Sequence, residues 1–113
     1  MPHVIIEHSD RAATVDALQT LCDAMFDQLA AHDAIAHPES LKIRTVQSGV
    51  HRLGTEPQSF AHATLLLLPG RSPETKAALA QLMLSVLQTH LGNVGSLSVN
   101  LSDLDPTYAK RVL

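Results

Sequence analysis

The residue best suited to catalytic chemistry is Pro2, which directly follows Met1. Removal of a methionine before a small residue would turn the Pro2 nitrogen from a tertiary amide into a secondary amine. An α-amino group has a pKa of about 8, and burial or nearby cations lower it toward neutrality. Such an amine is suited to proton transfer as a general base. If Met1 is retained, the Pro2 nitrogen stays an amide and this base is absent. The alternative interpretation is that the chain begins with Met-Pro for no catalytic reason.

Two arginines are candidates for binding an anion beside such a base. Arg71 lies between Gly70 and Ser72 at an expected helix start, where backbone amides and an arginine together favour a carboxylate. Arg44 follows Ile43 in an expected strand. If Ile43 faces the helices, Arg44 faces the opposite side of the sheet. For both arginines, a solvated or ion-paired side chain is the competing interpretation.

His62 precedes a run of leucines and is a candidate hydrogen-bonding residue near a site, with a structural histidine as the alternative. The other six histidines and the single Cys22 lack the spacing of a zinc site. The chain also contains no nucleophile elbow, Walker loop or dinucleotide-binding glycine fingerprint. The sequence therefore predicts neither a metal nor a cofactor.

Two successive strand–helix–strand units would have to position these residues. The first opens with a strand at Val4–Ile6 and a turn at Ser9–Asp10. A helix follows, because apolar residues recur at three- and four-residue steps over 15–29. These residues are Val15, Leu18, Leu21, Cys22, Met25, Phe26 and Leu29. An extended segment is expected over 41–53, with a bulge or bend at Gly49.

The second unit begins with a strand over 63–68, whose continuous apolar residues predict burial on both faces. The next helix has Ser72 as N-cap and Pro73 at its first position, and it ends at Gly92. Its buried stripe is Leu79, Leu82, Met83, Val86 and Leu87. The last strand, 96–101, alternates polar and apolar residues.

The two units predict an α+β fold with a four-stranded sheet and both helices on one face. We expect one domain over residues 1–113. The opposite face of the sheet would be bare unless subunits cover it, which predicts a homo-oligomer.

Composition narrows the partners. The chain has 113 residues, a formal net charge of −3, only 3% aromatic residues and no Trp. These values argue against binding of nucleic acid or of an anionic membrane surface. The longest apolar run is too short for a membrane span, and no secretory signal is recognisable. We therefore expect a cytoplasmic protein.

Several short motifs occur one after another across nearly the whole chain. Each is weak evidence alone, but together their order is informative. They are Pro2–Glu7 with Ser9–Asp10, Ile43–Arg44, Phe60–Leu65, Gly70–Ser72, Thr89–His90 and Asp105–Thr107. In this order they resemble the 5-carboxymethyl-2-hydroxymuconate isomerases of the tautomerase superfamily.

The resemblance implies a double β-α-β protomer, a homotrimer, no cofactor and active sites near subunit boundaries. Pro2 would match the catalytic N-terminal proline. Arg44 and Arg71 would match arginines that bind the substrate carboxylate and the developing oxyanion. The family substrate is an intermediate of bacterial homoprotocatechuate breakdown. The chain departs from the family pattern by a shorter loop around 54–58 and by Val46, where a second arginine is usual, so the natural substrate stays open.

The leading hypothesis is thus a proton shift in a small unsaturated 2-hydroxy/2-oxo carboxylic acid, with Pro2 as base and Arg71 and Arg44 as anion-binding residues. Fold does not fix function. A trimeric binding or signalling protein with little physiological catalysis is the main alternative. A related decarboxylase or dehalogenase that also uses Pro2 is a third.

Overall fold

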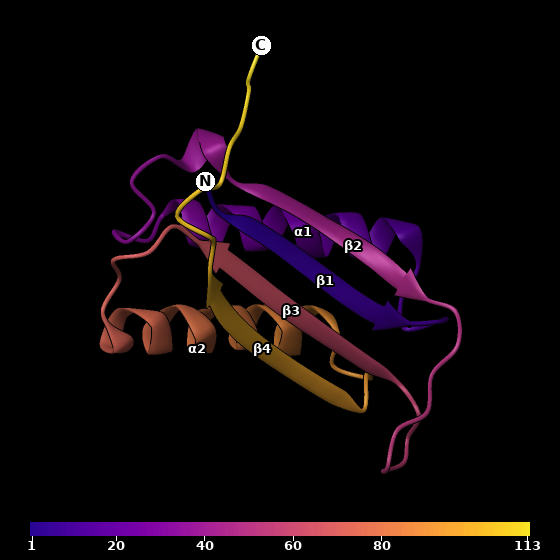
Figure 1. Ribbon diagram of the computed structural model, residues 1–113. Coiled ribbons are helices and arrows are strands. Elements are labelled where there is room, and N and C mark those ends of the chain that lie inside the picture. The colour runs from indigo at the N-terminus through magenta and orange to yellow at the C-terminus, as the bar shows by residue number, and fades with distance from the viewer.

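The computed structural model describes residues 1–113, which form one four-stranded sheet with both helices against the same face (Figure 1). The elements are β1 (His3–Ser9), α1 (Val15–Ala30), a 3-10 turn η1 (Pro38–Ser40), β2 (Lys42–Ser48), β3 (Phe60–Leu67), α2 (Pro73–His90) and β4 (Ser96–Asp103). The strand order is β2-β1-β3-β4. β1 and β2 are parallel, β3 and β4 are parallel, and β1 pairs antiparallel with β3. The predicted α+β architecture is confirmed.

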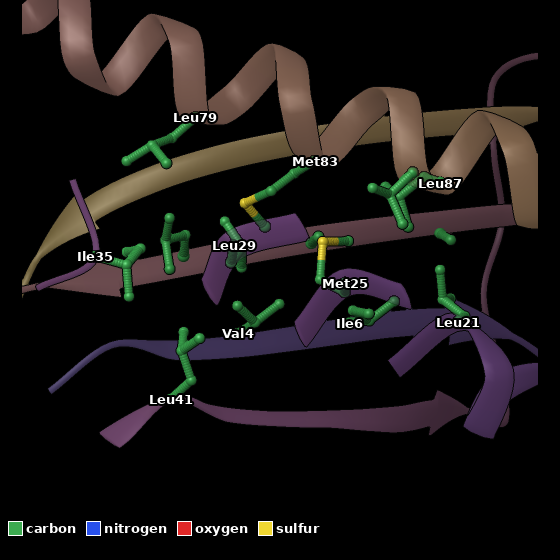
Figure 2. Close-up of a cluster of buried hydrophobic side chains, with 14 of the residues drawn as sticks. Val4, Ile6, Leu21, Met25, Leu29, Ile35, Leu41, Leu79, Met83 and Leu87 are labelled. Atoms are coloured by element: carbon green, nitrogen blue, oxygen red, sulfur yellow. The ribbon is translucent and has the colours of Figure 1, made fainter. Parts of the chain in front are cut away.

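The core lies between the helices and the inner face of the two central strands (Figure 2). The strands contribute every second residue, because successive side chains point to opposite faces. Those inner-face residues are Val4, Ile6, Ala61, Ala63, Leu65 and Leu67, all at most 1% exposed. The helices contribute Leu21, Met25, Leu29, Leu79, Met83 and Leu87, all fully buried. This packing holds β1 as a central strand of the sheet. Because β1 begins at His3, the N-terminus lies at the end of the sheet where β1 starts.

Both helices begin as expected for their sequences. The Ser72 hydroxyl accepts a hydrogen bond from the Thr75 amide at 3.2 Å, and Pro73 occupies the first helical position. Thr14 caps α1 in the same way, accepting from the Ala17 amide at 3.1 Å. The predicted cap of the second helix is confirmed.

The predicted apolar stripe of the first helix is too wide. Val15 is 82% exposed and Phe26 is 38% exposed, so neither belongs to the core. Phe26 follows the buried Met25 by one residue and is therefore turned about 100° around the helix axis. The buried stripe is narrower, formed by Leu21, Met25 and Leu29.

Two strand predictions are also corrected. The extended segment expected over 41–53 forms a strand only to Ser48, because β1 ends at Ser9, the register partner of Ser48. Gly49 therefore lies beyond the strand and does not bulge within it. The third strand is buried on one face only: Ala63, Leu65 and Leu67 are covered, whereas the alternate residues are partly exposed. Within a single chain no second layer covers that other face.

We call the side of the sheet away from the helices the bare face. It carries alternate residues of all four strands, including His3, Ile5, Glu7, Lys42, Arg44, Val46, His62, Thr64, Leu66, Ser98, Asn100 and Ser102. Charged, polar and apolar side chains are mixed on it. Neither helix has the length and apolarity that crossing a membrane would require.

Candidate active site

The N-terminus lies at one end of the sheet, between the start of β2 and the C-terminal tail (Figure 1). β1 and β2 run parallel, so both begin at this end, and the Lys42 amide donates to the Pro2 carbonyl at 3.1 Å. Pro2 is buried, and Met1 lines a cavity of about 540 Å³. The other lining residues are His37, Glu39, Ser40, Lys42, Leu68, Tyr108, Lys110 and Val112. We call this cavity the N-terminal pocket.

Arg71 lies in the loop between β3 and α2, close to the N-terminal pocket. Gly70 before it has φ 123°, a backbone angle that favours glycine and that turns the chain away from the strand. The Arg71 guanidinium donates to the Leu68 carbonyl at 3.0 Å and to the Ala34 carbonyl at 3.2 Å. Arg71 therefore ties this loop to the segment that follows α1.

The pocket is electropositive at the N-terminal amine. Partial burial lowers the pKa of the Met1 amine below its ordinary value, and the nearby charges of Lys110, Arg71 and Lys42 lower it further. These three cations come from the tail, the β3–α2 loop and the start of β2. An amine held among them is more readily found unprotonated at neutral pH than a free one.

Arg44 reaches the same end of the sheet through His3. Its guanidinium lies 3.1 Å from Nδ1 of His3, and Nε2 of His3 lies 2.7 Å from the Tyr108 hydroxyl. Because arginine only donates, Nδ1 accepts and the imidazole proton sits on Nε2, toward Tyr108. Burial lowers the pKa of His3, and the charges of Arg44, Lys42 and the N-terminus add to the effect. The lowered pKa favours the neutral form of His3.

His62 lies elsewhere. It is on the bare face, with Nδ1 2.6 Å from the Ser98 hydroxyl on β4. It lines a separate depression of about 230 Å³ together with Ile5, Glu7, Val46 and Thr64. The structure thus brings Pro2, Arg71 and, through His3, Arg44 to one end of the sheet, and it places His62 outside that group.

Sequence reasoning missed four residues of this region: His3, Lys42, Tyr108 and Lys110. A signal existed for Lys42, because it immediately precedes Ile43 and Arg44 in the same strand. Tyr108 and Lys110 lie in a short polar tail without periodicity. Only the folded chain returns that tail to the N-terminus.

Comparison with known proteins identifies the family. The sequence model of 5-carboxymethyl-2-hydroxymuconate isomerase matches residues 2–110. The chain belongs to the 5-carboxymethyl-2-hydroxymuconate isomerase family. Membership indicates an enzyme of the isomerase, or tautomerase, type. A sequence comparison with curated proteins finds no match.

Solved structures share the fold at low sequence identity. A 5-carboxymethyl-2-hydroxymuconate isomerase from Deinococcus radiodurans R1 is 24% identical with a TM-score of 0.83, over 98% of this chain and 90% of that one. A fused 4-OT wild-type symmetric trimer is 20% identical with a TM-score of 0.74, over 93% and 87%. A macrophage migration inhibitory factor-like protein from Entamoeba histolytica is 16% identical with a TM-score of 0.76, over 97% and 95%.

Proposed function

We propose that this isomerase family member moves a proton within a small unsaturated 2-hydroxy/2-oxo carboxylic acid, such as 5-carboxymethyl-2-hydroxymuconate, with the Pro2 amine as its base. The match to the family model supports the proposed type of reaction. The observation that supports the site is the position of Met1, which is bonded to the Pro2 nitrogen and lines the N-terminal pocket. Loss of Met1 would leave the Pro2 nitrogen facing this pocket as a secondary amine.

The proposed reaction is a proton transfer with no net change in the enzyme. Unprotonated Pro2 removes the proton of the 2-hydroxyl group, and the electron pair shifts along the conjugated system. The resulting dienolate then takes a proton at a carbon atom from the protonated Pro2 amine. The cations that lower the pKa of the Met1 amine would act on the Pro2 amine in the same direction.

Arg71 is the proposed partner of the substrate carboxylate or the developing oxyanion. Arginine has five N–H donors, and Arg71 uses two of them on the Leu68 and Ala34 carbonyls, which leaves three free. Those two bonds also hold the guanidinium in place before substrate arrives, which favours electrostatic stabilisation. Arg44 is proposed to bind carboxylate from the bare-face side, beside His3.

We further propose a homotrimer. The bare face presents partly buried apolar residues such as Ile5 and Leu66 among polar ones, and a related fused protein of the same fold is a symmetric trimer. Copies packed on this face would cover it. Sedimentation of the purified protein measures the state directly, and a monomer at micromolar concentration would contradict this part of the proposal.

The proposed function is tested with three preparations whose N-termini are verified by intact mass. The first has lost Met1, the second keeps one uncleaved residue before Pro2, and the third carries Pro2→Ala with Met1 removed. With 5-carboxymethyl-2-hydroxymuconate as substrate, blocking the Pro2 nitrogen is expected to lower kcat/KM at least about a hundredfold. Pro2→Ala keeps a primary amine and should retain part of the activity.

Equal turnover by the blocked and unblocked proteins would exclude Pro2 as the base. No turnover of any dienol by the unblocked protein would favour a binding function on the same fold. Turnover that is restricted to haloacrylates or to decarboxylation would move the protein to one of the related reactions.

A further inference from the structure

The C-terminal tail after β4 is folded back by its own hydrogen bonds. The Leu104 amide donates to the Leu67 carbonyl at 2.6 Å, which keeps the start of the tail against β3. The Asp105 carboxylate accepts hydrogen bonds from the Thr107 hydroxyl and from the Thr107 amide, the latter at 2.8 Å. The hydroxyl and, to a smaller extent, the amide lower the pKa of Asp105. The Tyr108 amide donates a hydrogen bond to the Asp105 carbonyl at 2.9 Å, which closes the turn. The turn therefore directs Tyr108 toward the N-terminus.

Tyr108 fastens the tail to β1 at the residue next to Pro2. Its hydroxyl lies 2.7 Å from Nε2 of His3, and the two rings meet edge-on with centroids 5.8 Å apart. Two residues further on, Lys110 lines the N-terminal pocket, and Val112 lines it as well. A segment with no regular secondary structure thus forms one wall of the pocket.

The pocket carries more positive charge than one carboxylate would need. Lys42 and Lys110 line it, and Arg71 is close enough to act on the N-terminal amine. Its lining carboxylate, Glu39, lies 3.4 Å from Nδ1 of His37 and forms no salt bridge with either lysine. Neither Lys42 nor Lys110 is paired with a carboxylate, so both ammonium groups are free to bind an anionic ligand, in addition to Arg71.

The second strand does not supply a further cation. Val46, two positions after Arg44, lies on the bare face in the depression that also contains His62. Lys42 and Lys110, which line the N-terminal pocket, are the cations placed to bind a second carboxylate there.

We propose that Lys110 binds a second carboxylate of the substrate, and that the Tyr108–His3 hydrogen bond holds the tail so that Lys110 reaches the pocket. Lys110 is thus a specificity-determining residue that selects substrates with more than one carboxylate, and Tyr108 is a positioning residue. This inference rests on the proposed function for the identity of the pocket, but binding can be measured without turnover.

The test compares two unreactive ligands with the same six-carbon diene, muconate with two carboxylates and sorbate with one. Their binding is measured by titration calorimetry on the full chain with Met1 removed. Lys110→Met is expected to weaken muconate about tenfold while changing sorbate less than about twofold, because only the charge-assisted contact to the second carboxylate is lost. Tyr108→Phe, which removes only the hydroxyl, is expected to weaken muconate about threefold.

Arg111→Met is the matched control, since Arg111 is an exposed cation of the same tail that does not line the pocket. It should leave both affinities unchanged. The proposal is overturned if Lys110→Met leaves muconate binding intact, if it weakens both ligands equally, or if Arg111→Met has the same effect. Selective loss of muconate binding in a protein that turns over no dienol would leave this inference standing and remove the proposed function alone.

Discussion

The two faces of the sheet are made from alternate residues of the same strands, and they differ in chemistry. In β3 the helix-covered face carries Ala63 and Leu65, both fully buried, whereas the bare face carries His62, Thr64 and Leu66, all partly exposed. In β1, Val4 and Ile6 are completely buried while Glu7 is exposed. The helix-covered face forms the hydrophobic core, and the bare face keeps mixed polar and apolar side chains partly exposed.

The difference also explains where the candidate site lies. A helix-covered face has no room for a polar ligand, because protein interiors are close-packed. The N-terminal pocket is instead found where β1 and β2 begin and the tail returns, at the end of the sheet. Arg44 and His3 extend the polar region from there onto the bare face. The candidate site and the core thus use the same strands without competing for the same side chains.

The largest expected effect comes from a matched pair on β3. Leu65→Ala should lower the free energy of unfolding by about 2–5 kcal/mol, because it leaves a cavity in the core. Leu66→Ala, one residue away on the bare face, should cost roughly 1 kcal/mol in the monomer because its side chain is only partly buried. Urea denaturation measures both.

The same pair reports on assembly when the protein concentration is varied. If copies of the chain cover the bare face, the cost of Leu66→Ala will grow with concentration, since association stabilises the folded state. If Leu65→Ala and Leu66→Ala lowered the free energy of unfolding equally at every protein concentration, the distinction between the two faces would be contradicted.

A smaller effect is expected at His62. His62→Ala removes the 2.6 Å contact with Ser98 and should cost about 1 kcal/mol or less. In the single chain His62 lies outside the N-terminal pocket, so kcat/KM should change less than about twofold. Ser98→Ala is the control that removes the same hydrogen bond. A tenfold fall in kcat/KM for His62→Ala alone would show that the bare face takes part in the chemistry.

The smallest effect is the pH dependence contributed by His3. Its pKa is lowered in the folded chain, so the unfolded chain binds the proton more readily. The stability contributed by neutral His3 is therefore present above its ordinary pKa of about 6.5 and is lost as pH falls through the lower folded value. Replacing His3 by Gln should flatten this part of the curve of unfolding free energy against pH. An unchanged slope just below about pH 6.5 would contradict the lowered pKa of His3.

Much of the fold could be predicted because local signals agree with one another. Ser72 and Pro73 mark a helix start by capping chemistry that needs no distant partner. The alternation of β4 indicates which residues face the helices. The errors arose where neighbours decide the outcome. Val15 and Phe26 have the right period but lie at the edge of the buried stripe, and the apolar run of β3 does not reveal that only one of its faces is covered.

The candidate site likewise contains residues that the sequence predicted and residues that only the structure revealed. Residue chemistry alone singled out Pro2, as a latent amine, and Arg71, as an arginine at a helix start. Tertiary structure decided that Lys42, Tyr108 and Lys110 share one pocket with the N-terminus. It also separated His62 from them.

By itself, the sequence determined the two β-α-β units, the helix caps, the family motifs and the identity of the candidate base, because these depend on residue type and on spacing along the chain. The tertiary structure decided which face of the sheet is bare and which cations surround the N-terminus. That depends on bringing the start of β1 and the tail after β4 together, more than a hundred residues apart in sequence, through hydrogen bonds such as Tyr108 to His3. No local pattern encodes such a contact.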